Sequence, residues 1–254
     1  MSLFSHTTGQ GPDLVLLHGW AMNGDVWEDI VPALAKDYRV TLVDLPGHGR
    51  SQDCPKDYTL TQLSAMLGEV MPPRAHLVGW SLGGMLASQF TLDFPQRVQS
   101  LILVASAPQF VRTDDWPDGV DPDVLTGFAA GLQQDYPQTL RRFIAIQALG
   151  SDHAREQQRS LRERVFRHGQ PQPAALEGGL AILQHANLRP RLEEIRCPTA
   201  FIAGEHDALF RPAAARATCE RLTQAALTVI PGAGHAPFLS HPAAFLAALK
   251  DSLP

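Results

Sequence analysis

Cysteine is scarce in this sequence. The three cysteines, Cys54, Cys197 and Cys219, are odd in number and widely spaced, and no two of them form a C-x-x-C pair. This spacing argues against a disulfide framework and against a zinc site, so no metal is expected. A reducing cytoplasm is the expected location. All three cysteines are interpreted as ordinary packed or surface residues.

Long apolar runs are also missing, and charge is low. The stretch 101–107 is among the longest apolar runs, and it is far short of the roughly 18–20 residues that span a bilayer. Residues 1–10 lack a basic start followed by an apolar run, so a secretory signal is not expected. Charged residues make up 19% of the chain, and the net charge is −5. We therefore expect neither a membrane nor a nucleic acid as a partner.

The composition that remains is typical of a globular protein. The chain has 254 residues, of which 44% are hydrophobic, with 20 glycines and 20 prolines. These values exclude a disordered chain, a coiled coil and a collagen. The length fits one large domain, or one domain that carries a sizeable insertion.

Short apolar runs alternate with longer amphipathic stretches along the chain. The runs lack polar alternation, which is typical of strands buried on both faces of a parallel sheet. Strand–helix–strand alternation predicts right-handed crossovers, and therefore a doubly wound, mostly parallel α/β sheet. The predicted strands are residues 14–17, 40–43, 76–79, 101–104, 200–204 and 227–230, and the predicted helices are residues 26–35, 60–70 and 81–94.

The middle of the chain breaks this alternation. Residues 109–189 contain no convincing strand, only helix-compatible sequence interrupted by prolines. That is too much helix for one crossover between two strands. We therefore predict a helical cap at 109–189, inserted into a core formed by residues 1–108 and 190–254. Ligands of open α/β sheets bind beyond the carboxyl ends of the strands, so an insertion there would cover the site.

The strongest chemical signal is a G-x-S-x-G motif at residues 79–83. It follows a predicted strand and opens a predicted helix. In this context the motif forms a tight turn that lifts the Ser81 hydroxyl above the sheet, and a Cβ at either glycine would clash with backbone. The helix amino terminus adds partial positive charge beside the serine. We predict Ser81 as a nucleophile.

A serine nucleophile requires a base and an acid that orients the base. This arrangement orders them serine, then Asp or Glu, then histidine. Asp207 and His235 each follow a late predicted strand, so they lie at the same sheet edge as Ser81. His235 would take the serine proton, and Asp207 would hold the imidazole in the required tautomer.

Other residues could in principle take these roles. Glu205 is the alternative acid. His206 adjoins Asp207 but comes too early in the chain for the base, and His241 is expected to cap or precede the last helix. Six further histidines are interpreted as structural or surface residues: His6, His18, His48, His153, His168 and His185.

An oxyanion hole would complete this chemistry. One donor should be the backbone N–H after the nucleophile, at Leu82, and the other should come from the loop after an early strand. Residues 18–20 form that loop, so the Trp20 N–H is predicted as the second donor. His18 is interpreted as a brace for this loop.

Five motifs together resemble those of the α/β-hydrolases, and the resemblance covers essentially the whole chain. It narrows to the biotin-pathway carboxylesterases that cleave the methyl ester of pimeloyl-[acyl-carrier protein]. The motifs are HGW at 18–20, DLPGHGRS at 44–51, GWSLGG at 79–84, GEHD at 204–207 and GAGH at 232–235. The resemblance to these carboxylesterases is carried by the sequence segments 18–23, 116–117, 122–125, 142–147 and 234–242.

The resemblance implies an α/β-hydrolase fold and a set of substrate-binding residues. These are Trp20, Ser81, Leu82, Phe143, Gln147 and His235. Phe143, Trp20 and Trp80 are candidates for the wall that holds the acyl chain, although Trp80 could instead be core. One departure is the sequence DALFRP at 207–212, where these enzymes more often have DGLVP.

Arginine is concentrated within the predicted cap. Residues 141–167 hold seven arginines, opposed by Asp152, Glu156 and Glu163, so this segment is near +4. Arg155, Arg159 and Arg162 recur at helical spacing on one face. A solvated helix surface would explain this pattern, and so would a docking patch for an acidic partner. The resemblance implies docking of acyl-carrier protein by Arg142, Arg155 and Arg159. The family often has a further arginine where this chain has Gln138, so that contact is either missing or supplied by Arg141.

The sequence thus predicts a monomeric serine carboxylesterase of biotin precursor synthesis that needs no cofactor. It would hydrolyse the methyl ester of pimeloyl-[acyl-carrier protein] to the free acid and methanol. The alternatives on the same scaffold are a general short-chain esterase, an enol-lactonase and a carbon–carbon bond hydrolase. A ligand receptor without activity is the alternative outside enzymes.

Overall fold

A computed structural model of the chain describes residues 2–149 and 154–253. Within these residues, seven strands form one sheet in the order β1-β3-β2-β4-β5-β6-β7. The fold is therefore the doubly wound α/β sheet that the alternation of runs predicts. The strands are β1 (Ser5–Thr8), β2 (Asp13–Leu17), β3 (Arg39–Val43), β4 (Ala75–Trp80), β5 (Val98–Val104), β6 (Thr199–Gly204) and β7 (Ala225–Ile230).

Strands β2 to β7 are parallel, and β1 pairs antiparallel with β3. The six parallel strands coincide with the six apolar runs, so that prediction is confirmed. Strand β1 was not predicted because it is a short, polar and mostly exposed edge strand. The chain adds β3 on one side of β2 and then β4 on the other. The loops after β2 and β4 therefore meet where the strand order reverses, which is where ligands of such sheets bind.

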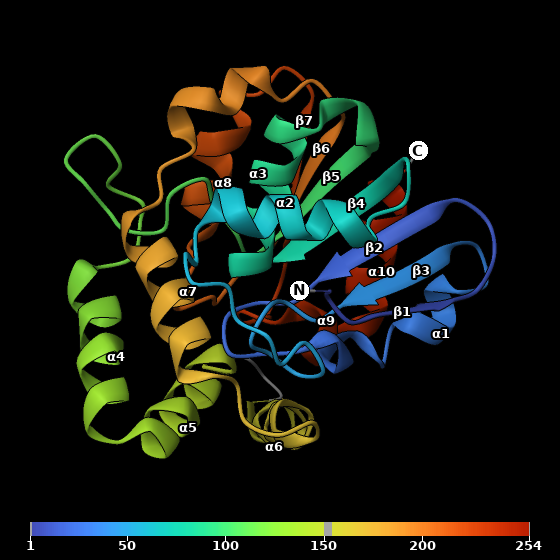
Figure 1. The fold of residues 1–254 in the computed structure, drawn as a ribbon. Coiled ribbons are helices and arrows are strands. Elements are labelled where there is room, and N and C mark those ends of the chain that lie inside the picture. The colour runs from blue at the N-terminus through green and yellow to red at the C-terminus, as the bar shows by residue number, and fades with distance from the viewer. Residues whose placement is uncertain (1, 150–153, 254) are drawn as a thin grey trace.

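Helices cover both faces of the sheet (Figure 1). Helices α2 and α3 lie in front of the sheet in this view, and α1 and α10 lie behind it. Helix α3 is buried from Leu82 to Leu92, which makes it the central helix of the core. The helices of the core are α1 (Val31–Leu34), α2 (Leu60–Val70), α3 (Leu82–Asp93), α8 (Pro212–Cys219), α9 (Pro237–Ser240) and α10 (Pro242–Asp251), with 3-10 helices η1 (Gly24–Trp27), η2 (Pro95–Arg97) and η3 (Arg189–Glu194).

The helix predicted over residues 26–35 is wrong. That stretch contains the end of η1 and then the short helix α1, which begins only at Val31. Proline is tolerated in the first turn of a helix but not in its interior, because it lacks the N–H and its ring clashes with the preceding turn. Pro32 therefore forces the helix to begin beside it.

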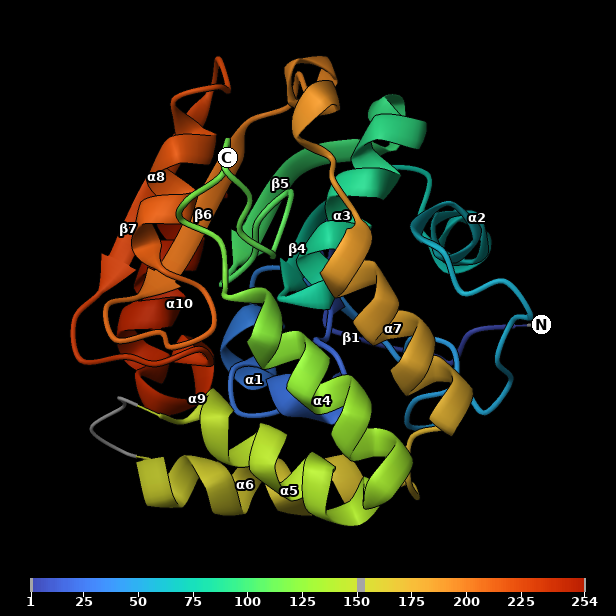
Figure 2. The ribbon, with the colours of Figure 1, turned by 90° about the vertical axis from the view of Figure 1, so that its left-hand side faces the viewer.

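Four further helices lie between β5 and β6, at the carboxyl ends of the strands. The arrowheads of β2 and β3 point toward them in Figure 1, and Figure 2 shows them from their own side. They fall within the segment predicted as a cap, whose boundaries at 109 and 189 stay a prediction. Among the described residues, no helix is both long and apolar enough to cross a membrane. The four helices are α4 (Pro122–Gln134), α5 (Tyr136–Gln147), α6 (Ala154–Phe166) and α7 (Pro173–His185).

Candidate active site

Ser81 occupies a strained turn between β4 and α3. Its backbone has φ 55° and ψ −119°, a region that residues other than glycine rarely adopt. The surrounding core holds this conformation through hydrogen bonds at both ends of the residue. The Ser81 N–H donates to the Val104 carbonyl at 3.0 Å, and its own carbonyl accepts from the Gly84 N–H at 2.9 Å and the Ser106 hydroxyl at 2.7 Å.

The glycines around Ser81 are required by close backbone contacts. A Cβ at Gly79 would press against the carbonyl of Gly83, and a Cβ at Gly83 would press against the carbonyl oxygens of His18 and Leu17. Backbone atoms cannot move aside as the end of a flexible side chain can. The motif therefore brings β4, α3 and the loop after β2 closer together than any side chain would allow.

Asp207 and His235 come from the loops after β6 and β7 and meet in the interior. Asp207 Oδ2 accepts from His235 Nδ1 at 2.7 Å, and neither side chain is more than 1% exposed. The other carboxylate oxygen accepts from the N–H groups of Leu209 and Phe210, both at 2.8 Å. This carboxylate is thus fixed by its own loop.

The loop that carries His235 is held by residues far away in the chain. The His235 N–H donates to the Gln147 carbonyl at 3.2 Å, and the His235 carbonyl accepts from the Trp80 indole N–H at 2.8 Å. The two rings lie 5.8 Å apart, and Trp80 directly precedes Ser81. His235 Nε2 is buried and has no hydrogen-bond partner among the described residues, Ser81 included. The imidazole therefore has one nitrogen fixed by a carboxylate and the other available.

The loop after β2 passes beside the serine. A Cβ at Gly19 would lie 3.2 Å from Ser81 Cβ, so the Trp20 backbone is next to the turn. His18 braces this loop, because its Nε2 accepts from the Leu45 N–H at 2.9 Å and its Nδ1 bonds the Gly19 carbonyl at 2.8 Å. Burial lowers the pKa of His18, which favours the neutral ring that this pattern needs.

A second buried histidine lies behind this brace. The ring of His48 is 5.3 Å from that of His18, and burial lowers its pKa to about 3. Nearby Asp44 is also fully buried and accepts from the Gly24 N–H at 2.7 Å and from Arg50 Nε at 2.7 Å. Burial alone would raise the pKa of Asp44, but the hydrogen bond from Arg50 brings it below its usual value. Both histidines of this region are thus structural, as interpreted from the sequence.

Helices α5 and α7 cover the site with apolar side chains. The Trp20 ring packs edge-on against Phe143 of α5 at 4.5 Å, and its indole N–H donates to the Leu176 carbonyl of α7 at 2.8 Å. A Cβ at Gly179 would lie 2.7 Å from a Trp20 ring carbon and 3.1 Å from a methyl group of Leu82. Helix α7 therefore approaches both residues closely enough to require glycine there.

Gln147 adds polar atoms to this covered region. The residue is 1% exposed, and neither its amide nitrogen nor its amide oxygen has a hydrogen-bond partner among the described residues. It lies one turn after Phe143 on α5, so the two side chains share a face. Buried polar atoms are rarely left unpaired. Gln147 and His235 Nε2 are therefore suited to meet the polar groups of a bound molecule.

The remaining candidates lie elsewhere. Glu205 is exposed and accepts from the Gly232 N–H at 3.0 Å. The carboxylate that contacts His235 is that of Asp207. His206 is exposed, and His241 precedes α10 as expected. His153 lies outside the described residues, which contain no group of three or more His, Cys, Asp or Glu side chains that could hold a metal.

Two predicted residues have a clearer role than the sequence indicated, and one residue was missed. Trp80 is core beneath the His235 loop, because it packs edge-on against Phe238 at 5.0 Å and bonds the loop backbone. Trp20, in contrast, packs against the helices above the site. Ser106, which supports the Ser81 carbonyl, was missed, and its position just past a buried strand was the only signal that could have indicated it.

A model of the alpha/beta hydrolase fold matches residues 12–242. The chain belongs to the α/β-hydrolase family. It is 48% identical, over 97% of both chains, to a protein of Aeromonas hydrophila named pimeloyl-[acyl-carrier protein] methyl ester esterase. It is 44% identical to a protein of the same name from Nitrosomonas europaea, over 96% of this chain and 97% of that one.

Solved structures of the family agree with this fold. An esterase from Exiguobacterium antarcticum superposes with a TM-score of 0.90 at 26% identity, over 98% of this chain and 94% of that one. An enol-lactonase from Burkholderia xenovorans superposes with a TM-score of 0.87 at 22% identity, over 98% and 95%. Because the enol-lactonase is only 22% identical, its similarity supports the fold and nothing further.

Proposed function

We propose that this protein is a serine esterase that hydrolyses the methyl ester of pimeloyl-[acyl-carrier protein]. The observation that carries the proposal is the 2.7 Å hydrogen bond between His235 and Asp207, which leaves the second imidazole nitrogen unpartnered in a covered site near a strained serine turn. The relatives at 44–48% identity supply the substrate, because their names state it.

The reaction follows from these groups. His235 Nε2 takes the proton of the Ser81 hydroxyl as its oxygen attacks the ester carbonyl, and the Asp207 carboxylate stabilises the imidazolium. The N–H groups of Leu82 and Trp20 donate to the oxyanion; that of Leu82 suits this role because the first N–H of a helix has no intrahelical acceptor. The tetrahedral intermediate collapses, and His235 returns the proton to the leaving oxygen, which departs as methanol.

A water molecule completes the cycle. It gives its proton to His235 and attacks the acyl-enzyme carbonyl, and the second tetrahedral intermediate expels the Ser81 oxygen, which takes the proton back. The products are methanol and the free carboxylic acid, still attached to its carrier. No step uses a metal or an organic cofactor.

The covered region above Ser81 fits an acyl chain. Trp20, Phe143 and Phe128 pack edge-on or tilted against one another with ring centroids 4.5–6.4 Å apart. Burial of a methylene group against such a wall contributes about 0.8 kcal/mol. Gln147 offers the polar atoms that the ester end would meet.

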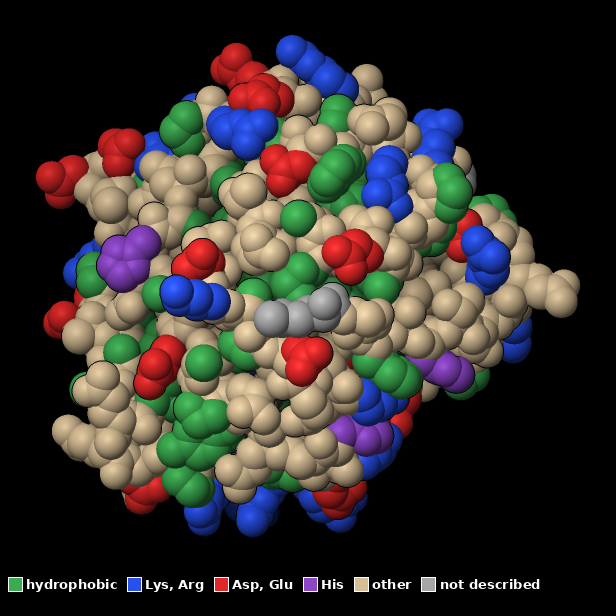
Figure 3. All heavy atoms as spheres, in the orientation of Figure 1, with side chains coloured by type: hydrophobic (Ala, Val, Ile, Leu, Met, Phe, Trp, Pro, Cys, Tyr) green, Lys and Arg blue, Asp and Glu red, His purple; other side chains and the backbone are tan. Residues whose placement is uncertain are grey.

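The exposed arginines of α5 and α6 fit an acidic carrier. Arg141 and Arg142 on α5 and Arg155 and Arg159 on α6 are exposed, and none forms an ion pair with a described residue. Figure 3 shows Lys and Arg side chains along the lower edge of the molecule, where Figure 1 labels α5 and α6. Asp152, which the sequence sets against this charge, lies outside the described residues.

A hollow lies beside this charged surface. It measures about 200 Å³ and lies between α4 and α5. Arg142 and Phe128 both line it, and Phe128 contacts Phe143 and Trp20 inside. We propose that the arm of the carrier protein follows this direction from the arginines to the serine.

The test compares two substrates: the carrier-bound methyl ester and p-nitrophenyl acetate. We expect Ser81→Ala to lower kcat by about 10⁴-fold or more on both, because the hydroxyl is the nucleophile. Hydrolysis that survives this change on either substrate would contradict the proposed mechanism. If the wild type hydrolyses the small ester only, the protein is instead a general short-chain esterase.

The same assay tests docking with a matched charge reversal. The triple variant Arg142→Glu, Arg155→Glu, Arg159→Glu should lose most of its kcat/KM for the carrier-bound ester and keep that for the small ester. The control reverses Arg74, Arg196 and Arg221, which are also exposed but precede β4, β6 and β7 at the opposite edge of the sheet. Equal losses in the two triple variants would reject the docking surface.

Two further expectations stay predictions. A monomer is expected, and its mass in solution can be measured by light scattering. A cytoplasmic location is expected from the cysteine pattern, since the free thiols Cys54, Cys197 and Cys219 form no disulfide. Fractionation of cells that express the full chain would test the location.

A further inference from the structure

Helix α6 presents two different faces. Arg155, Arg159 and Arg162 are exposed on one side. Gln157, Leu161 and Arg164 recur at the same spacing on the other side and are buried. An amide and a guanidinium are unusual on a buried face, because polar side chains lose their hydration there. Each must therefore have a partner or a role inside.

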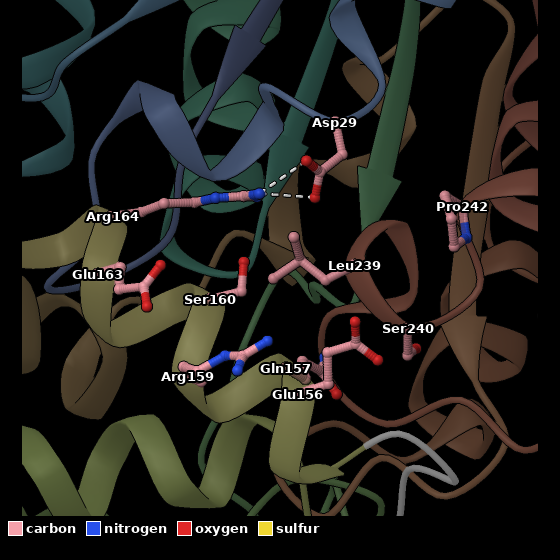
Figure 4. A pocket seen from close by; sticks show the side chains of 10 residues that line it. All are labelled: Asp29, Glu156, Gln157, Arg159, Ser160, Glu163, Arg164, Leu239, Ser240 and Pro242. Carbon is pink, nitrogen blue, oxygen red and sulfur yellow. Dashed lines mark hydrogen bonds and ion pairs between the residues drawn. The ribbon is translucent and has the colours of Figure 1, made fainter.

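Arg164 has an evident role, which is to attach α6 to the core. Its guanidinium binds both carboxylate oxygens of Asp29 at 2.7 Å and the Val26 carbonyl at 3.2 Å. Figure 4 shows this ion pair at one end of a hollow of about 460 Å³ between α6 and the segment that carries Leu239 and Ser240.

Gln157 reaches across from the same face to the loop of the proposed base. Its side-chain amide donates to the Ala236 carbonyl at 3.0 Å, and Ala236 directly follows His235. Gln157 lines the hollow but is only 3% exposed (Figure 4). It is thus a direct link from the inserted helices to the Ala236–Pro237 peptide unit, one residue beyond the base.

Folding alone gives little reason for a glutamine here. The Ala236 carbonyl already accepts from the N–H groups of Leu239 at 3.1 Å and Ser240 at 3.3 Å, so it does not need a further donor. The Gln157 amide oxygen is buried with no hydrogen-bond partner among the described residues, which lowers stability. An apolar side chain of the same size would avoid that loss.

We propose that Gln157 is a positioning residue for His235. The Gln147 carbonyl and the Trp80 indole hold the two peptide units that flank the base, and the Gln157 amide holds the next one, between Ala236 and Pro237. This fixes the direction of the imidazole toward Ser81. The proposal rests on the proposed function, because it requires His235 to be the base.

The test replaces Gln157 with methionine, which has a similar length and no donor. We expect kcat for p-nitrophenyl acetate to fall about tenfold, because small displacements of a catalytic group are costly. KM should stay unchanged, since acylation and deacylation both use His235 and slow together. The thermal midpoint should stay the same or rise, because the unpaired oxygen is gone.

The control is Gln158→Met on the same helix. Gln158 donates to the Ala145 carbonyl at 3.4 Å, on α5 rather than on the His235 loop. This variant should keep the wild-type kcat. In addition, the downfield proton NMR signal of the His235–Asp207 hydrogen bond should change in Gln157→Met and not in Gln158→Met.

The outcomes separate this proposal from the proposed function. An unchanged kcat in Gln157→Met, or a loss of activity matched by an equal loss of stability, would overturn the positioning role. Neither result would affect the proposed function, which fails only if Ser81→Ala retains activity in parallel assays. A tenfold lower kcat with an intact thermal midpoint and an altered proton signal would support the positioning role.

Discussion

The turn that carries Ser81 is built from the sheet and from the helix that follows it, whereas the loop that carries His235 is tied to inserted helices. On the serine side, close backbone contacts at Gly79 and Gly83 and the brace from His18 fix the geometry. On the histidine side, Trp80 and Asp207 of the core are joined by the Gln147 carbonyl of α5 and the Gln157 amide of α6.

This difference teaches that the inserted helices do more than cover the site. Backbone contacts on the serine side leave little freedom, because no side-chain rotation can relieve them. Single hydrogen bonds on the histidine side are individually weak, at about 1 kcal/mol net each. Changes on the serine side should therefore affect the whole fold, and changes on the histidine side should affect mainly the alignment of His235.

The largest effect is expected on the serine side, for Gly83→Ala. The added Cβ would meet two backbone carbonyls that cannot move aside. We expect a loss of about 3 kcal/mol or more in the free energy of unfolding, or failure to fold, together with loss of hydrolysis. Urea unfolding measures the loss of stability, and an ester assay measures the loss of hydrolysis.

Gly127→Ala is the matched control for that substitution. Gly127 lies inside α4, and a Cβ there would meet nothing within 4 Å. Alanine is the better helix former by about 1 kcal/mol, so this variant should be slightly more stable. A Gly83→Ala protein as stable and active as Gly127→Ala would break the contrast between the two sides.

A smaller effect is expected for Arg164→Ala, which loosens the attachment of α6. The buried guanidinium loses its bonds to Asp29, whose carboxylate is half exposed, so the free energy of unfolding should fall by about 2 kcal/mol. Arg162→Ala, on the exposed face of the same helix, should change it by less than about 0.5 kcal/mol. Thermal unfolding compares the two variants. Equal losses of stability would show that the buried face of α6 contributes no more to stability than its exposed face.

The smallest effect is the response of the serine side to acid. The folded-state pKa of His48 is about 3, below its ordinary 6.5, because of burial. The unfolded chain therefore binds the proton more readily, and stability is lost as the pH falls below 6.5. Between pH 7 and pH 6 we expect a loss of about 0.7 kcal/mol from this residue, and His18 acts in the same direction.

Urea unfolding at the two pH values measures this loss. His48→Gln should show a smaller difference between pH 7 and pH 6 than the wild type. His6→Gln on the exposed strand β1 should show the wild-type difference. A His48→Gln protein with the full wild-type pH response would locate the acid sensitivity elsewhere.

Much of the core could be predicted from local sequence. Helix α2 has the predicted bounds, because it has one apolar stripe, Thr59 caps its start, and two prolines follow Met71 at its end. The five buried parallel strands were also found, since a strand covered on both faces is uniformly apolar. Strand β7 alternates between half-buried and exposed residues and was found from its short apolar run. Strand β1 was not found, because its four residues are polar and carry no apolar run.

The site was predictable where a motif sets the local backbone, and not where contacts cross the chain. The predicted pairing of Asp207 with His235 is present as a hydrogen bond. Helical spacing also indicated the exposed arginines of α6, but it could not show that Arg164 and Arg167 of the same cluster bind acidic residues of the core. Such partners depend on how two distant segments pack.

The position of the insertion has a consequence for synthesis. The ribosome completes the strained turn and the loop beside it first, then the four helices between β5 and β6, and only at the end the segment with Asp207 and His235. A chain that stops early would lack the proposed base of Ser81. By the proposed mechanism, hydrolysis would begin only in molecules whose translation has run almost to the last helix, and a truncated product would not consume substrate.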